Sequence, residues 1–157
     1  MAQHEHTYGV RVEWTGNRGS GTSGYRDYGR EHTIGAVGKA DIAGSSDPAF
    51  RGNAERWNPE DLLVASASAC HQLWYLHLCA DAGVRVLRYV DDATGTMRDG
   101  DKGHFTRIVL RPRVLIRAGD DGELAARLHH DAHARCYVAN SVNFPIECEP
   151  VIESAVG

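Results

Sequence analysis

The sequence lacks the features that mark several common classes of protein. It contains no repeat and no low-complexity tract. Its 17 Lys and Arg are mixed with 21 Asp and Glu for a net charge of −4, so it has no concentrated basic face of the kind that nucleic acid or an anionic membrane requires. The start, MAQHEHTYGV, has no apolar core of the kind that a secretory signal needs, so we predict a cytoplasmic protein.

The sequence also lacks a clear membrane span. Residues 62–80 form a run of 19 residues without Asp, Glu, Lys or Arg, but the run carries two Ser, two His and a Gln, which are costly in hydrocarbon. We interpret it as a helix in a protein core. A chain of 157 residues fits a single domain, residues 1–157. In a reducing compartment no static disulfide framework is expected among its four cysteines, Cys70, Cys79, Cys136 and Cys148.

Clear signals bound a long helix around this run. Asn58 can cap the helix, and Pro59 suits its first position. Glu60 and Asp61 stand in the first turn, where the helix dipole favours acids, and Gly83 follows the last turn. Because apolar or small residues occupy nearly every face, we expect burial nearly all round, with a second subunit covering part of the helix.

Strand patterns surround this helix. The residues before about position 50 are rich in Gly, Thr, Tyr and Val, which favours short strands joined in hairpins. Residues 84–97 and 105–118 are further strand candidates; the second alternates apolar residues with Arg, and its Pro112 suggests a bulge or an edge. Residues 120–136 form a second helix, and an alternating strand at 144–153 closes the chain. This order of elements predicts the α+β class.

Helix geometry limits the partners of Cys70. Cys79 lies nine residues further on. That is about 13 Å along a helix axis, whereas bridged cysteines need Cα atoms within about 7 Å. The remaining partners are Cys136, at the end of the second helix, and Cys148, in the last strand. The residues after Cys136 have the composition of a helix end or turn, where a thiol can move. We interpret Cys79 and Cys148 as core residues.

Two cysteine motifs resemble those of the OsmC/Ohr family of thiol-dependent hydroperoxide reductases. WNPEDLLVASASAC, residues 57–70, resembles the family's Asn-Pro-Glu segment that leads to a cysteine. CYVANSV, residues 136–142, resembles its second cysteine with a Ser-containing turn, and VEWTGNRGSGTSG, residues 12–24, its glycine-flanked arginine. The resemblance implies an α+β fold with antiparallel sheets and a long buried central helix. It also implies an intertwined homodimer, with two sites at the dimer interface.

The resemblance assigns roles to single residues. Cys70 matches the peroxidatic thiolate and Cys136 the resolving thiol. Glu60 matches the glutamate that pairs with the catalytic arginine. The candidates for that arginine, with the best match first, are Arg18, Arg26 and Arg30. Tyr137 stands where many relatives have proline, which suggests a different substrate pocket.

The implied reaction needs no cofactor and no metal. The thiolate attacks the O–O bond of a hydroperoxide, releases an alcohol and becomes a sulfenic acid, which the second thiol converts to a disulfide. An external dithiol restores both thiols, and the resemblance points to dihydrolipoyl groups as that reductant. An apolar wall favours an organic hydroperoxide over hydrogen peroxide; its residues are Leu62, Leu63, Leu73, Trp74 and Leu76.

Three other functions compete with this one. Helical spacing places His129, His133 and Cys136 on one face, and these ligand types suit zinc, although a second ligand cluster is missing from the sequence. A cysteine hydrolase would need His71 or His77 as base, and neither reaches Cys70 easily along a helix. A non-catalytic dimeric stress or binding protein of the same fold would use its cysteines only for packing.

Overall fold

The computed structural model describes residues 2–157. Contacts within the chain divide it into two compact units, one that ends at Leu62 and one that covers Leu63–Gly157. No helix among the described residues combines the length and the apolarity that a membrane span needs. The interpretation of residues 62–80 as a helix of a protein core agrees with this finding, and the single domain stays a prediction.

The first unit contains the expected hairpins. Its sheet has the order β1-β2-β3 and is antiparallel throughout, with β1 (Arg11–Trp14), β2 (His32–Gly35) and β3 (Ile42–Gly44). A short 3-10 helix, η1 (Pro48–Phe50), follows β3. The guanidinium of Arg56 donates hydrogen bonds to the carbonyls of His32 and Gly44, at 3.2 and 3.3 Å. Arg56 therefore holds β2 and β3 to the segment that leads out of the sheet.

The long helix α1 (Pro59–Ala82) begins and ends as predicted. The backbone N–H of Asp61 donates to Asn58 Oδ1 at 2.8 Å, and the N–H of Asn58 donates back to Asp61 Oδ2 at 3.3 Å. This reciprocal pair satisfies two of the N–H groups that a helix start leaves free. At the other end Gly83 adopts a φ of 76°, the left-handed conformation that ends many helices.

One stripe of α1 is buried, rather than nearly its whole circumference. The buried residues recur every four positions: Ala67, His71, Tyr75 and Cys79. Leu73, on another face, keeps 67% of its surface exposed. Within the single chain, the second unit covers only this one face of α1. Burial nearly all round, which we expect only with a second subunit, stays a prediction.

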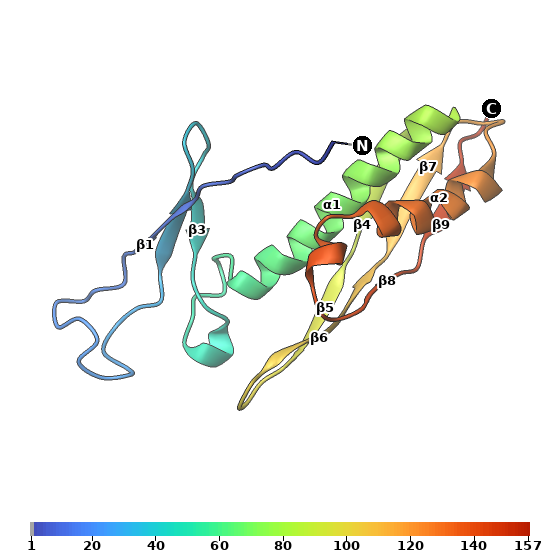
Figure 1. Cartoon of the computed structure of the whole chain (residues 1–157). Helices are drawn as coiled ribbons and strands as arrows, with labels where there is room; N and C mark the ends of the chain where they lie inside the picture. Colours follow the sequence, from blue (N-terminus) through green and yellow to red (C-terminus); the bar gives the residue numbers. More distant parts are fainter. Residues whose placement is uncertain (1) are drawn as a thin grey trace. The chain divides into compact units, whose positions relative to one another are not determined.

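The second unit contains two sheets of three short strands each, which Figure 1 shows beside α1. Their strands are β4 (Val86–Asp91), β5 (Thr94–Arg98), β6 (His104–Leu110), β7 (Pro112–Ile116), β8 (Ile146–Cys148) and β9 (Val151–Ser154). The sheets have the orders β4-β7-β9 and β5-β6-β8, and each has one antiparallel and one parallel pair. The chain passes between the two sheets at residues 92–93, 111 and 149–150. The α+β class is confirmed, with parallel pairs beside the antiparallel ones.

The alternation predicted for residues 105–118 is present, but it covers two strands. Ile108, Leu110, Val114 and Ile116 are all nearly fully buried. Pro112 is the first residue of β7, the central strand of its sheet, so it marks neither a bulge nor an edge. A strand start tolerates proline because no ladder hydrogen bond is lost there. The N–H of Arg111 leaves the ladder and donates to Asp91 Oδ1 at 2.6 Å.

The second helix, α2 (Gly122–Arg135), is capped by Asp121, whose Oδ1 accepts from the N–H of Leu124 at 3.0 Å. Asp120, which we expected to open the helix, lies before it. Its carboxylate accepts hydrogen bonds from the backbone N–H and the guanidinium of Arg85, at 2.7 and 2.5 Å. This ion pair joins the loop before α2 to the start of β4. A 3-10 turn, η2 (Ala139–Ser141), follows α2.

We expect the ion pair of Asp120 to make stability depend on acid pH. The hydrogen bonds from Arg85 lower the pKa of Asp120 from its ordinary 3.8 to about 2. A lowered pKa in the folded state means that the stabilisation is complete above pH about 4 and is lost as the pH falls through about 2. Urea unfolding at pH 5 and pH 3 should therefore show a larger loss of midpoint for wild type than for Asp120→Asn.

The control for this experiment is Asp101→Asn, in the exposed turn between β5 and β6. It should lose as much midpoint on acidification as wild type does. Equal losses in wild type and Asp120→Asn would contradict the assignment.

Candidate thiol site

Two of the predicted site residues, Cys70 and Cys136, meet in the second unit. Cys70 lies in the middle of α1 and is half-buried, whereas Cys136 follows the last residue of α2 and is 1% exposed. The Cys70 side chain lies close enough to that of Cys136 to raise the pKa of the Cys136 thiol. The backbone N–H of Ala139, in η2, also donates to Cys136 Sγ at 3.4 Å. The end of α2 and the turn after it thus present one thiol to the other.

The surroundings favour opposite roles for the two thiols. Burial raises the pKa of the Cys136 thiol, the hydrogen bond from Ala139 opposes this shift, and the contact with Cys70 adds to it. Cys136 is therefore a neutral thiol at pH 7. It is better suited to react with an already oxidised cysteine than to attack an oxidant itself. Cys70 is the member of the pair that solvent reaches.

An apolar surface lies beside this pair. Leu73 and Tyr137 are 67% and 70% exposed, and the ring of Trp74 meets that of Tyr137 edge to face at 5.6 Å. A shallow hollow of about 200 Å³ is lined by Leu73, Trp74 and His77. The guanidinium carbon of Arg135 lies 5.7 Å from the Trp74 ring centroid. Two residues of the predicted apolar wall, Leu73 and Trp74, are thus available to an apolar ligand.

The three candidate arginines lie in the loop between β1 and β2, and they differ in what they contact. The guanidinium of Arg30 donates to the carbonyls of Tyr25 and Tyr28, both at 2.7 Å, and stacks on both rings. Arg30 is therefore engaged in holding the loop together. Arg18 and Arg26 are exposed and make no side-chain hydrogen bond or ion pair with residues 2–62.

A turn presents Arg18 to solvent. The side-chain oxygen of Asn17 accepts hydrogen bonds from the N–H groups of Gly19 and Gly21, at 2.9 and 3.0 Å. Glu60 stands half-buried in the first turn of α1. Arg18 and Glu60 belong to the unit that ends at Leu62, and the two cysteines to the other. The roles of Arg18 and Glu60 therefore stay predictions.

The histidines do not form the helix-face metal site that the sequence suggested. The helix α2 ends at Arg135, and the backbone of Cys136 is extended, so Cys136 leaves the face of His129 and His133 and contacts Cys70 instead. His129 contacts residues that the sequence did not connect with it. Its Nδ1 lies 3.0 Å from Nε2 of His71, and Cys148 Sγ lies 3.8 Å from the same nitrogen.

Sequence reasoning missed this second cluster of His71, His129 and Cys148 (the histidine–cysteine cluster). Burial lowers the pKa of His71 to about 4 and that of His129 to about 3, so both rings are neutral at pH 7. Cys148 is half-buried and packs against a core cluster, as we expected, but it also contacts His71. No spacing rule could have found the cluster, because its members come from α1, α2 and β8.

The hydrolase alternative gains no support from these contacts. His71 bonds to His129, and His77 forms an ion pair with Asp81 at 3.3 Å on the exposed side of α1. Neither histidine makes a hydrogen bond to Cys70 in the described part of the chain. A cysteine hydrolase needs a base within hydrogen-bond reach of its thiol.

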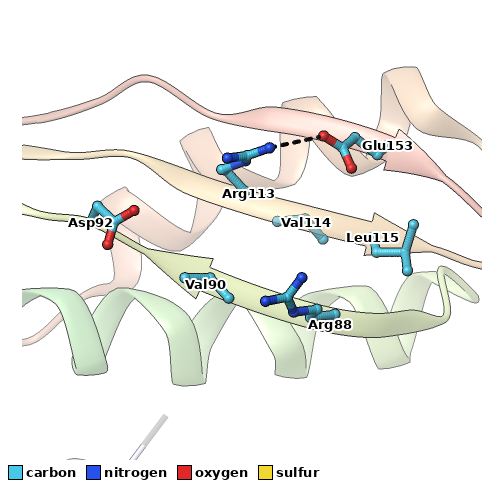
Figure 2. A pocket seen from close by; sticks show the side chains of 7 residues that line it. All are labelled: Arg88, Val90, Asp92, Arg113, Val114, Leu115 and Glu153. Carbon is cyan, nitrogen blue, oxygen red and sulfur yellow. Dashed lines mark ion pairs between the residues drawn. The ribbon is translucent and has the colours of Figure 1, made fainter.

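A further hollow of about 310 Å³ lies on the face of the sheet β4-β7-β9. Figure 2 shows the charged side chains that line it: Arg88, Asp92, Arg113 and Glu153. Arg113 and Glu153 form an ion pair at 3.6 Å, also drawn in Figure 2. The two positive and two negative charges balance, and the hollow is open. This face therefore has the character of a solvated sheet surface.

Two neighbouring thiols, one on a long helix and one just after a second helix, define the candidate site of this α+β protein. The family model of the OsmC-like protein matches residues 52–150. The chain therefore belongs to the OsmC-like family. None of the curated proteins compared with the chain matches it.

Solved structures extend the similarity to nearly the whole chain. An OsmC-like protein of unknown function from Vibrio cholerae is 29% identical with a TM-score of 0.81, over 96% of this chain and 100% of that one. An organic hydroperoxide resistance protein from Elizabethkingia anophelis, with thiocyanate bound, has 19% identity and a TM-score of 0.65, over 97% and 100% of the two chains. A putative organic hydroperoxide resistance protein from Vibrio cholerae, with captopril in one active site, has 20% identity and a TM-score of 0.63, over 96% and 95%. At these identities the last two similarities show the fold.

The four thiols should differ in their rates of alkylation. Burial raises the pKa of Cys79, of Cys136 and of Cys148, the last to about 12, so little thiolate forms at these positions. We expect iodoacetamide at pH 8 to modify Cys70 first, as followed by peptide mass spectrometry. In denatured protein all four cysteines should react alike. Faster modification of Cys136 than of Cys70 would contradict the roles that the site suggests.

Proposed function

We propose that this protein is a thiol-dependent peroxidase that reduces organic hydroperoxides to alcohols through Cys70 and Cys136. The contact between the partly exposed Cys70 thiol and the buried Cys136 thiol is the observation that carries the proposal. Family membership supports it, because structures similar to this chain include organic hydroperoxide resistance proteins.

The reaction has three steps. The Cys70 thiolate attacks the terminal oxygen of ROOH and the O–O bond breaks. The OH group goes to the sulfur, which becomes a sulfenic acid, and the alkoxide takes one proton and leaves as ROH. The Cys136 thiol then attacks that sulfur and displaces water, which leaves a Cys70–Cys136 disulfide. An external dithiol, proposed to carry dihydrolipoyl groups, reduces the disulfide and is itself oxidised. Electrons thus pass from the dithiol to the peroxide, and no metal or cofactor enters these steps.

Arg18 and Glu60 are proposed to complete the site. A guanidinium keeps its charge at every physiological pH and can donate to a thiolate and a peroxide oxygen together. Arg18 fits this role better than Arg30, whose guanidinium already bonds to two tyrosine carbonyls. Glu60 would orient Arg18 as an ion-pair partner. Both residues would reach the thiols in an intertwined homodimer, in which a second copy covers the exposed side of α1.

The apolar surface beside the thiols supports an organic substrate. Leu73, Trp74 and Tyr137 offer an alkyl or aryl group apolar area to bury, which hydrogen peroxide cannot use. A reducing, cytoplasmic compartment would keep the dithiol available, and we propose that location.

Cysteine variants test the proposed reaction. With dihydrolipoamide as reductant, wild type should consume cumene hydroperoxide with a higher kcat/KM than hydrogen peroxide. Cys70→Ser should be inactive, since it has no thiolate to oxidise. Cys136→Ser should consume about one equivalent of peroxide and then stop, with a sulfenic acid at Cys70 that dimedone traps.

Cys79→Ala is the matched control, because it removes a core thiol of α1 and should keep turnover. If wild type turned over neither peroxide with dihydrolipoamide or dithiothreitol, the proposal would fail. The non-catalytic stress or binding protein of the same fold would then be the better interpretation.

A pair of loop variants tests the arginine. Arg18→Ala should lower kcat for cumene hydroperoxide by about 100-fold or more, the usual loss when one donor to a transition state is removed. Arg26→Ala removes an equally exposed charge from the same loop and should keep kcat within a few-fold. A large loss with Arg26→Ala and none with Arg18→Ala would reverse the assignment.

A further inference from the structure

Three metal-ligating side chains from three separate elements meet in the histidine–cysteine cluster of His71, His129 and Cys148. His71 comes from the middle of α1, His129 from α2, and Cys148 is the last residue of β8. One ligand atom of each lies within 4.8 Å of the other two. The two histidines are 1% and 3% exposed. This is a built site, because rigid helices and a strand hold all three positions.

The spacing of the ligand atoms suits a tetrahedral cation. With zinc bonds of about 2.0 Å to nitrogen and 2.3 Å to sulfur, tetrahedral ligands lie about 3.3 Å apart for two nitrogens and about 3.5 Å for nitrogen and sulfur. The observed separations are 3.0 Å between the His71 and His129 nitrogens and 3.8 Å between His71 Nε2 and Cys148 Sγ. All three ligand atoms lie within 4.8 Å of one another, so movements of the side chains alone would bring them to these separations.

Hydrogen bonding alone does not account for the cluster. The two rings share one hydrogen bond, and this leaves Nδ1 of His71 and Nε2 of His129 buried without a partner among residues 2–157. Each such buried polar group lowers the stability of the fold. A core selected for packing only would place apolar side chains here.

The charge around the cluster favours a cation. Burial is the largest influence on both groups: it lowers the pKa of His71 and raises the pKa of Cys148. The carboxylate of Asp91 accepts hydrogen bonds from Ser68 Oγ and the N–H of Arg111. It is close enough to raise the pKa of both His71 and Cys148 by a smaller amount. His133 is the opposing basic group, and it lowers the pKa of His71. The negative charge of Asp91, which disfavours the Cys148 thiolate, would stabilise a bound divalent ion.

The cluster also opens to solvent on one side. A cavity of about 300 Å³ is lined by His129 and Cys148 together with His130 and His133. A cation held by the three ligands would direct its fourth position toward this cavity, where water can enter. Three protein ligands and one open position are typical of zinc sites that exchange a water or bind a small molecule.

We propose that His71, His129 and Cys148 form a binding site for a zinc-type divalent cation, distinct from the Cys70–Cys136 pair. The donor set of two imidazoles and one thiolate suits Zn²⁺ and its spectroscopic substitute Co²⁺. On binding, Cys148 loses its proton and each histidine keeps one on the ring nitrogen that faces away from the ion.

Metal binding by the full-length chain tests the proposal. After chelator treatment and buffer exchange, Zn²⁺ alone should bind at about one ion per chain and raise Tm. Co²⁺ should give the intense visible bands of a tetrahedral site and a thiolate charge-transfer band in the near ultraviolet. Cys148→Ser should lose the charge-transfer band. Loss of a residue that only supports a metal ligand weakens binding by roughly 10- to 100-fold. His71→Ala and His129→Ala each remove a ligand, so they should weaken Zn²⁺ binding by more than this.

Matched variants separate this site from its alternatives. His130→Ala changes the same cavity without removing a ligand and should keep the stoichiometry. His133→Ala and Cys136→Ser should also keep the stoichiometry of one ion per chain. If both of these variants lost the metal, the site would lie on the face of α2 instead. Cys70→Ser should bind Zn²⁺ as wild type does, so the result is independent of peroxidase activity. Absence of a thiolate band in wild-type protein with Co²⁺ would overturn the proposal without any variant.

Discussion

The rest of the second unit depends on one constraint: one stripe of α1 packs against the sheets of this unit and against α2. Tyr75, in the middle of this stripe, stacks on the ring of His129 with centroids 3.8 Å apart and donates its hydroxyl proton to the carbonyl of Ala125 at 2.9 Å. These contacts fix the position of α2 along α1. The end of α2 is thereby fixed as well, and with it the position of Cys136.

Neighbouring residues of α1 serve two different clusters because a helix turns by about 100° per residue. His71 lies on the buried stripe and meets His129 and Cys148, while Cys70 lies at the edge of the stripe and meets Cys136. The environment differs accordingly, since His71 is fully enclosed and Cys70 is partly open to solvent. The packing of one helix can thus position the proposed redox pair and the proposed cation site without overlap between them.

Local signals predicted the helices well, and long-range pairing was harder. The bounds of α1 follow from Asn58, Pro59 and Gly83, which act within one turn of their own positions. The sequence also predicted the alternation across residues 105–118. It did not predict that this run divides into β6 and β7, because the division depends on the pairing of these residues with strands of two separate sheets. Nor did it predict the parallel pairs, since partners such as β7 and β9 are far apart in the chain.

For the sites, the sequence by itself determined which cysteines are candidates. Helix geometry excluded a bond from Cys70 to Cys79 and left Cys136 and Cys148 open, and the resemblance of the motifs to the family's paired Cys70 with Cys136 as a hypothesis. Only the tertiary structure decided that Cys70 and Cys136 lie close together, that α2 ends before Cys136, and that His129 faces His71 and Cys148. The physical reason is that a ligand cluster depends on distances in space, and three side chains from α1, α2 and β8 have no common period in the sequence.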